Sequence, residues 1–281
     1  MHASLFRRIQ RYGWDAATEA YDRDWVPLLE NLTNDCVDHA RLRPGERVLD
    51  LATGTGIAAL RAARIVGVRG AVTGVDISER MVARAAQSAK AAEATGGIDG
   101  PPISAIVFER RDMDATGAGD GAFDAVIAAF GLMYAADRQA AFAEISRVLS
   151  PGGRASVCVW GRRQACGWAE VFPIVDAHVE SEVCPLFFSL GVPGALRFSF
   201  EKSGLVDVVE ESLPVTLRWA SPDNACAAML EGGPVALAWR RFAPDIRAEV
   251  RRAYLASIEP YRRGTRYEVP SEIVFATARK P

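Results

Sequence analysis

The sequence has little that would tie it to a metal ion or a disulfide framework. Its five cysteines are scattered and form no Cys-x-x-Cys pair, and its three histidines (His2, His39 and His178) lie far apart along the chain. An odd, dispersed set of cysteines does not indicate disulfide bridges, and neither residue type has the spacing of a zinc site. We therefore expect no metal and a reducing, cytoplasmic compartment.

Long apolar runs and an excess of one charge are also missing. No stretch of about 18 apolar residues occurs, so we expect no membrane span. The first residues carry charge but lack the apolar segment of a secretory signal. The chain has 33 Lys and Arg residues against 35 Asp and Glu residues, a net charge of −2, which argues against a nucleic-acid-binding protein. What remains is the composition of an ordinary globular domain, with 49% hydrophobic and 24% charged residues.

Apolar strand patterns alternate with helical patterns in the first half of the chain. The expected strands are residues 47–51, 71–75, 103–108, 123–128 and 155–160. Helices are expected after Gly56, at 78–94 and at 138–149, with a turn at Pro151-Gly152-Gly153 before the fifth strand. Apolar strands separated by helices indicate a mostly parallel sheet covered on both faces. The predicted fold class is α/β, a doubly wound Rossmann-like sheet.

The pattern differs before and after this core. The first 40 residues are expected to be helical because Trp14, Tyr21 and Trp25 recur with other apolar residues at helical spacing. Beyond Trp160 we expect a helical, aromatic-rich stretch at 164–203, a strand at 206–217, helices at 222–230 and 243–258, and a final strand at 271–278. We expect one domain made of N-terminal helices (1–42), a core (43–160), further core elements with cap insertions (161–264) and the last strand (265–281).

A glycine-containing loop, Asp50-Leu-Ala-Thr-Gly54-Thr-Gly56, follows the first strand. Glycine lets the backbone approach a ligand closely, and a helix N-terminus presents free N–H groups. The loop also satisfies a loose dinucleotide pattern, Gly54-x-Gly56-x-x-Ala59. Asp50 separates the two interpretations, because a carboxylate there would repel a pyrophosphate but accept hydrogen bonds from an ammonium group. The loop therefore favours a nucleoside that carries an amino acid.

Two further acids follow the next two strands. Asp76 lies 20 residues after Gly56, where a carboxylate can accept both hydroxyls of a ribose. Asp112 suits an adenine amino group, with Ile77 and Met113 as apolar walls for the ring. A single Asp at a strand end is as often a cap or turn residue, but three in succession favour a ligand. Asp124, inside a strand, is interpreted as structural.

Together these motifs resemble the class I S-adenosylmethionine-dependent methyltransferases, in particular the small-molecule group of quinone-biosynthesis C-methyltransferases. The motifs are Asp50–Gly56, Gly74–Ser78, Arg111–Met113, Phe123–Val126 and Arg147–Gly153, and they span about residues 45–160. The resemblance implies a seven-stranded sheet with an antiparallel last strand, S-adenosylmethionine as cofactor with S-adenosylhomocysteine as its product, and it allows a homodimer. One departure is Ala52, where the family often has a glycine.

The resemblance also implies which residues bind each ligand. The expected cofactor contacts are Tyr21, Asp50, Thr53, Gly54, Gly56, Asp76, Ile77, Met81, Asp112, Met113, Ala129 and Phe130. The expected acceptor pocket consists of Trp14, Trp25, Phe130, Met133, Tyr134, Trp168 and Met229. Residues 14–25 resemble lid helices of the family, with Tyr21 closing over the cofactor's amino-acid end. The alternative is an amphipathic helix packed on the sheet, and both can hold together.

Catalysis by such an enzyme requires alignment and exclusion of water, and it requires a base only where a proton must leave. His178, in the inserted region, is the sequence candidate for that base, with an idle surface residue as the alternative. Tyr134 is the second catalytic candidate. We favour alignment and desolvation. The absence of Asn-Pro-Pro-Tyr and Asp-Pro-Pro-Tyr disfavours methylation of DNA bases or protein glutamine.

The sequence therefore predicts methyl transfer to the oxygen, nitrogen or carbon of an apolar, aromatic or heteroaromatic small molecule. Two alternatives stay open. An NAD-dependent dehydrogenase shares the glycine loop and Asp76, although it would not need Asp50 and Asp112. A non-enzymatic protein could retain the cofactor-binding fold for scaffolding or regulation.

Overall fold

The centre of the molecule is a mixed sheet with the strand order β3-β2-β1-β4-β5-β8-β6. The computed structural model describes residues 3–99, 104–180, 184 and 186–281. The strands are β1 (Arg47–Leu51), β2 (Ala71–Asp76), β3 (Ala105–Arg110), β4 (Phe123–Ala129), β5 (Leu149–Trp160), β6 (Val206–Trp219), β7 (Arg262–Arg263) and β8 (Arg266–Arg279). Strands β1 to β5 are parallel, and β8 runs antiparallel to both β5 and β6. The expected antiparallel last strand is confirmed, while the two-residue β7 adds an eighth strand in the described part of the chain.

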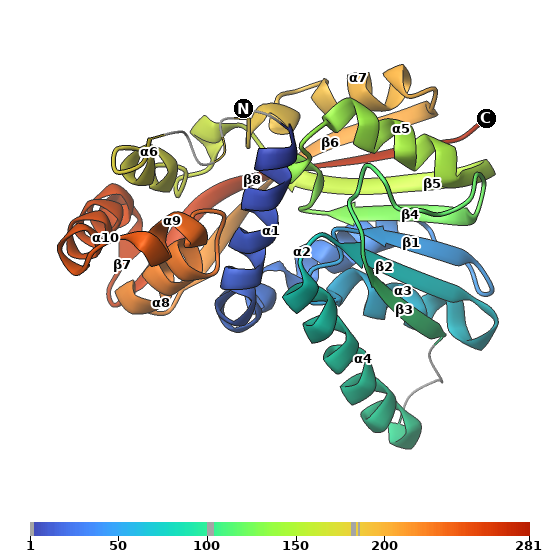
Figure 1. Ribbon diagram of the computed structural model, residues 1–281, viewed down its shortest axis with the longest axis horizontal. Helices are drawn as coiled ribbons and strands as arrows, with labels where there is room; N and C mark the ends of the chain where they lie inside the picture. Colours follow the sequence, from blue (N-terminus) through green and yellow to red (C-terminus); the bar gives the residue numbers. More distant parts are fainter. Residues whose placement is uncertain (1–2, 100–103, 181–183, 185) are drawn as a thin grey trace.

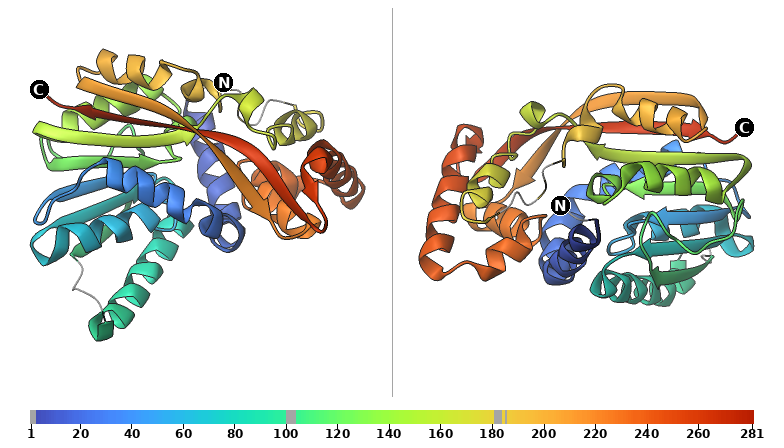
Figure 2. Two further views of the ribbon diagram at one scale, coloured as in Figure 1. Left: turned by 180° about the vertical axis from the view of Figure 1, so that it is seen from behind. Right: turned by 45° about the horizontal axis from the view of Figure 1, so that its top comes forward.

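Helices cover both faces of this sheet (Figures 1 and 2). One face carries α2 (Val26–His39), α3 (Ile57–Val66) and α4 (Glu79–Asp99), and the other carries α5 (Arg138–Val148) and α7 (Ala195–Lys202). In α3 the buried residues are Ala58, Ala59, Ala62, Ala63 and Val66, a stripe at helical spacing. Since alanines are small, α3 packs closely on β1 and β2. The predicted doubly wound α/β class is confirmed.

Several expected boundaries differ from the structure for local reasons. The segment Pro151–Gly153 is an irregular part of β5 and not a turn before it, because the register with β4 shifts there and Gly152 takes a positive φ of 75°. Among the described residues of 164–203, only α6 (Val171–Asp176) and α7 form α-helices, together with turns and short 3-10 segments. The helix α9 (Ala236–Arg241) was not predicted. Ile103, the expected start of β3, lies outside the described residues.

The N-terminal helices and the cap lie at the carboxyl end of the parallel strands (Figure 1). α1 (Ala3–Ala20) continues through a π-helical turn, η1 (Tyr21–Trp25), into α2. β8 extends beyond its last residue pair with β5, Trp160 with Ile273, and continues to pair with β6 as far as Trp219 and Tyr267. This ribbon carries α8 (Pro222–Cys226), η6 (Ala227–Glu231), α9 and α10 (Pro244–Ile258), which are inserted between its two strands. The insertion is thereby held over the end of the sheet where the parallel strands have their carboxyl ends.

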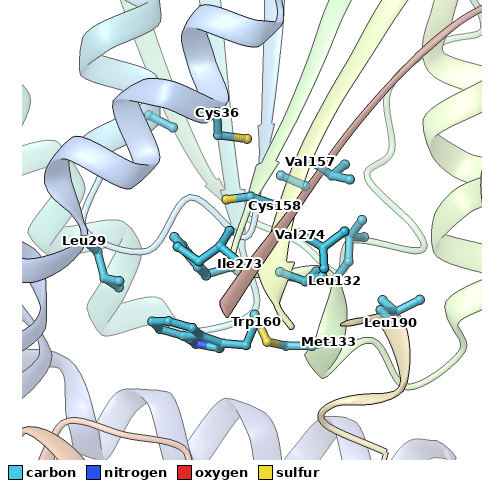
Figure 3. Close-up of a cluster of buried hydrophobic side chains, with 14 of the residues drawn as sticks. Leu29, Cys36, Leu132, Met133, Val157, Cys158, Trp160, Leu190, Ile273 and Val274 are labelled. Atoms are coloured by element: carbon cyan, nitrogen blue, oxygen red, sulfur yellow. The ribbon is translucent and has the colours of Figure 1, made fainter. Parts of the chain in front are cut away.

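The core beneath this edge joins α2, β5 and β8 (Figure 3). Cys36 of α2 and Cys158 of β5 are both fully buried, and burial together with the Cys36 thiol raises the pKa of the Cys158 thiol. The five cysteines are free thiols, so they serve as apolar packing groups. Among the described helices, none is long and apolar enough to cross a membrane.

Candidate active site

A cavity lies at the carboxyl ends of β1 to β5. α1, η1 and the start of α2 roof it on one side, and loops of the cap close it on the other. Thirteen predicted site residues line it: Trp14, Tyr21, Trp25, Gly54, Asp76, Ile77, Met81, Asp112, Met113, Ala129, Phe130, Tyr134 and Trp168. The strand ends of a parallel sheet meet at one edge, so residues from distant motifs converge there.

Asp76 marks the polar end of the cavity. One carboxylate oxygen accepts a hydrogen bond from the Gly54 N–H at 3.0 Å, and the other accepts one from the Ser78 N–H at 2.9 Å. Burial raises the pKa of Asp76 to about 6 despite these bonds. The Ile77 N–H also contributes to this hydrogen bonding, and the remaining acceptor capacity of the carboxylate faces the cavity.

Asp50 lies beneath the glycine loop and does not line the cavity. It is 1% exposed, accepts the Thr53 hydroxyl at 2.6 Å, and also accepts the backbone N–H of Ala59 in the first turn of α3. Burial raises the pKa of Asp50 to about 7. This placement departs from the expectation that Asp50 would face an ammonium group, because Thr53 and α3 already occupy the carboxylate. The same bonds keep the Thr53 side chain beneath the loop, while Gly54 borders the cavity.

Two left-handed residues shape the floor of the cavity. Ala52 has a φ of 54° and Phe130 a φ of 56°, in the loops that follow β1 and β4. A Cβ on Gly131 would lie 2.4 Å from the Cβ of Ala52, so the two loops touch back to back. Such strained conformations persist only where surrounding contacts impose them, and they concentrate at ligand sites. The left-handed φ of Ala52 explains why glycine, which adopts such angles without a steric penalty, would fit at this position.

Asp112 follows the end of β3 and forms an ion pair with a residue of α1. Arg7 donates through Nε to Asp112 at 2.8 Å and also pairs with Asp114. Ile77 and Met113 line the same end of the cavity, as the sequence led us to expect. The polar end is therefore a slot with apolar walls, bordered by Asp76 and Asp112.

Aromatic side chains dominate the opposite end, below β4, β5 and the cap. Tyr134 lies edge-on to Trp14 and to Phe187, with ring centroids 5.0 Å and 5.4 Å apart. Trp160, at the end of β5, packs against Phe130 at 5.0 Å and against Trp168 at 5.2 Å. Edge-to-face arrays of this kind are favourable and rigid. The charged residues of the lining, Arg7, Asp76, Arg111 and Asp112, all belong to the polar end.

Titratable groups at the aromatic end are neutral near pH 7. Burial raises the pKa of both Tyr21 and Tyr134 above the ordinary tyrosine value. His178 lies elsewhere, in a second hollow on the outer side of α1, where its ring contacts Phe242. Among the described residues lining the aromatic end, we find no carboxylate or histidine that could take a proton.

Four further predicted residues support the cavity without lining it. Met133 and Met229 are buried in the core at 3% and 0% exposure. Thr53 holds Asp50, and Gly56 has a φ of 92° at the start of α3. No group of three or more potential metal-ligating side chains occurs in the part of the chain that the structure describes.

Comparison with known proteins agrees with this geometry. Residues 48–153 match the family model described as a methyltransferase domain. The ubiquinone/menaquinone biosynthesis C-methyltransferase of Serratia proteamaculans is 29% identical over 201 residues, covering 72% of this chain and 76% of the relative. That of Geobacter sulfurreducens is 38% identical over 172 residues, covering 60% of each chain. These matches support a class I S-adenosylmethionine-dependent methyltransferase domain in this chain.

Solved structures share the fold of this methyltransferase. A phosphoethanolamine N-methyltransferase of Haemonchus contortus superposes with a TM-score of 0.62 at 18% identity, covering 98% of this chain and 60% of that one. The YcgJ protein of Bacillus subtilis gives a TM-score of 0.59 at 15% identity, covering 89% and 98%. Nothing in these comparisons supports the alternative of an NAD-dependent dehydrogenase.

Sequence reasoning missed part of the methyltransferase's cavity. The unpredicted lining residues include Arg7, Gln10, Leu29, Ala52, Arg111, Trp160, Phe187 and Gly232 to Pro234. Trp160 could have been found, because it ends the fifth strand just as Asp76 ends the second. Phe187 and the Gly232–Pro234 loop reach the cavity only through the cap, and no local motif marks them.

Proposed function

We propose that this methyltransferase transfers a methyl group from S-adenosylmethionine to an aromatic or heteroaromatic small molecule. The observation that carries the proposal is the division of one cavity into a polar end at β1 to β3 and an aromatic end at β4, β5 and the cap. A nucleoside needs the hydrogen-bonding groups of the first, and a flat apolar acceptor fits the second.

The residues at the polar end fit the cofactor. Gly54 has a positive φ and open space where its Cβ would be, so a ligand can approach the backbone there. Asp76 has remaining acceptor capacity for ribose hydroxyls, and its own position is fixed by Gly54 and Ser78. Ile77 and Met113 would flank the adenine ring, and Asp112 would accept from its amino group. When bound, the cofactor supplies a methyl group activated by its sulfonium.

Other predicted residues would act through these contacts. Asp50, with Thr53, holds the glycine loop and the start of α3 in place and is a positioning residue. Met81 and Ala129 add apolar contact, and Tyr21 lies between the two ends of the cavity, edge-on to Trp14 at 5.8 Å.

The aromatic end supports catalysis by alignment and desolvation. Trp14, Tyr134 and Trp168 would form apolar walls around a flat ring and exclude water. With the Tyr21 and Tyr134 hydroxyls protonated near pH 7, the acceptor would have to be nucleophilic without a protein base. Similarity to enzymes named C-methyltransferases favours a carbon acceptor.

Calorimetric titration tests the cofactor half of this proposal. S-adenosylhomocysteine should bind the wild-type chain, and Asp76→Asn should bind it at least tenfold more weakly, since a hydrogen bond to a charged group contributes about 1.5–3 kcal/mol. Asp38→Asn is the matched control, because Asp38 is exposed and pairs with Arg61 away from the cavity. Equal affinity of all three proteins would refute the assignment of Asp76.

Transfer of a labelled methyl group tests the catalytic half. Incubating the protein with methyl-labelled S-adenosylmethionine and a fractionated cell extract should label a small, apolar product. Cofactor binding without any labelled product would leave a binding protein, the non-enzymatic alternative.

A further inference from the structure

Gln10 is the only side-chain amide among the described residues that line the cavity. It lies on the face of α1 that also presents Trp14, four residues further along the helix. Its side chain is 93% buried, because the residue is only 7% exposed. A buried amide without good partners is costly, so its surroundings call for an explanation.

The hydrogen bonding of Gln10 within the protein is weak. Its amide nitrogen donates to the Cys184 sulfur at 3.8 Å, and a thiol sulfur is a poor acceptor. Its carbonyl oxygen accepts no hydrogen bond from the described residues. The carbonyl oxygen of Gln10, a strong acceptor, and most of the donor capacity of its NH₂ group are therefore available to a ligand.

The position of Gln10 points to the acceptor. The Cys184 thiol that it contacts also lies close enough to Tyr134 to add to the raised pKa of that hydroxyl. Gln10, Trp14, Gly233 and Pro234 line both the main cavity and the outer hollow that contains His178. Of these four junction residues, only Gln10 has a side chain that both donates and accepts strongly.

We propose that Gln10 is a specificity-determining residue whose amide binds a neutral hydroxyl or amide group of the methyl acceptor. This inference rests on the proposed function. Inside the main cavity an ionised group would find no opposite charge at the aromatic end, because the lining charges belong to the polar end and Arg7 is engaged by Asp112 and Asp114. Glu180 and Arg241 line the outer hollow and not the main cavity. A neutral group that both donates and accepts matches what the amide offers, and it would fix the orientation of the ring.

Binding of two isosteric probes to the protein saturated with S-adenosylhomocysteine tests the proposal. 1-Naphthol and 1-methylnaphthalene differ by a hydroxyl in place of a methyl group, and quenching of tryptophan fluorescence reports binding near Trp14 and Trp168. In Gln10→Met, which keeps the length of the side chain, the ratio of the two dissociation constants should shift at least fivefold toward 1-methylnaphthalene. This corresponds to about 1 kcal/mol for one hydrogen bond.

The control is Gln87→Met, the same change at an exposed position of α4, which should leave the ratio as in the wild type. S-adenosylhomocysteine affinity should stay within twofold in both variants. A ratio that changes less than twofold in Gln10→Met would overturn the proposal, as would a parallel loss of cofactor affinity or failure of both probes to bind. If the wild type does not bind S-adenosylhomocysteine at all, the proposed function is refuted, and this outcome is distinct from a refutation of the role of Gln10.

Discussion

Asp50 and Asp76 are two buried carboxylates beside the glycine loop, and their surroundings differ. Asp76 faces the cavity and Asp50 faces the protein, although both follow parallel strands. Burial raises the pKa of each, to about 6 and about 7. Their partners decide the difference: backbone N–H groups leave Asp76 open to a ligand, whereas Thr53 and α3 hold Asp50.

The raised pKa of Asp76 predicts pH-dependent cofactor binding. The proposed ribose hydroxyls would bind the ionised carboxylate, and Asp76 of the free protein takes up a proton as the pH falls through about 6. Affinity for S-adenosylhomocysteine should therefore be full above pH 7 and fall by up to about tenfold per pH unit below 6. Calorimetry between pH 5 and 8 measures this. In Asp76→Asn the loss should be constant across the range, and a persistent acid limb there would assign the titration to another group.

Ala52 offers a test of backbone strain. Its left-handed φ of 54° costs an L-residue about 1–2 kcal/mol, and glycine avoids that cost. Because glycine loses more chain entropy on folding, Ala52→Gly should raise the free energy of unfolding by about 0.5–1 kcal/mol. Ala52→Val should lower it by more than 1 kcal/mol, since a β-branched side chain resists this conformation. Urea denaturation compares the three proteins, and a destabilised glycine variant would contradict the strain argument.

The N-terminal helix α1 has two different faces, and each binds a different part of the molecule. One face forms a polar stripe, in which Asp15 accepts from the Ser78 hydroxyl at 2.7 Å and Glu19 pairs with Arg80. Asp22 of η1 continues it by pairing with Arg84. The other face, with Trp14, packs toward the cavity and α9. α1 is thus anchored by polar contacts to α4 and by apolar ones to the cap.

Breaking the polar stripe should loosen α1 without unfolding the sheet. Asp15 also accepts the Arg80 N–H at the start of α4, so Asp15→Ala removes two contacts at once. Amides of α1 should then exchange with deuterium at least fivefold faster, consistent with about 1 kcal/mol for a capping contact, while amides of β1 and β4 keep their rates. Asp38→Ala, which removes an exposed pair between α2 and α3, should leave α1 unchanged. Uniformly faster exchange would indicate global destabilisation instead.

At the scale of the whole molecule, the overhanging ribbon of β6 and β8 brings the cap to the strand ends (Figures 1 and 2). Trp25 of η1 donates its indole N–H to the Ala228 carbonyl at 2.7 Å and so ties the N-terminal helices to η6 of the cap. The proposed cofactor and acceptor ends of the cavity therefore come from different parts of the chain and should respond to different substitutions.

Substitution in the cap should separate binding from transfer. Phe187 packs against Tyr134 and Trp168 at the aromatic end. Phe187→Leu should keep S-adenosylhomocysteine affinity within threefold but lower the rate of methyl transfer at least tenfold, because the acceptor is less well aligned. A comparable loss of cofactor affinity would show that the two ends are not independent.

The outer position of His178 predicts a small kinetic effect. A general base contributes about 10²–10⁴-fold in rate, so His178→Ala should cost less than tenfold if alignment suffices. The measurement is the pH–rate profile of both proteins. A hundredfold loss, with disappearance of an acid limb near the histidine pKa, would identify His178 as the base.

The sequence by itself determined the alternation of strands and helices, the glycine loop and the strand-end acids. These features are local, since each depends on residues within a few positions of one another. Only the tertiary structure decided which acid faces the ligand, where His178 lies and which residues complete the cavity. Arg7 meets Asp112 across 105 positions of the chain, and Gln10 meets Cys184 across 174. Contacts at such separations come from how the N-terminal helices and the ribbon-borne cap pack on the sheet, and no local pattern encodes that packing.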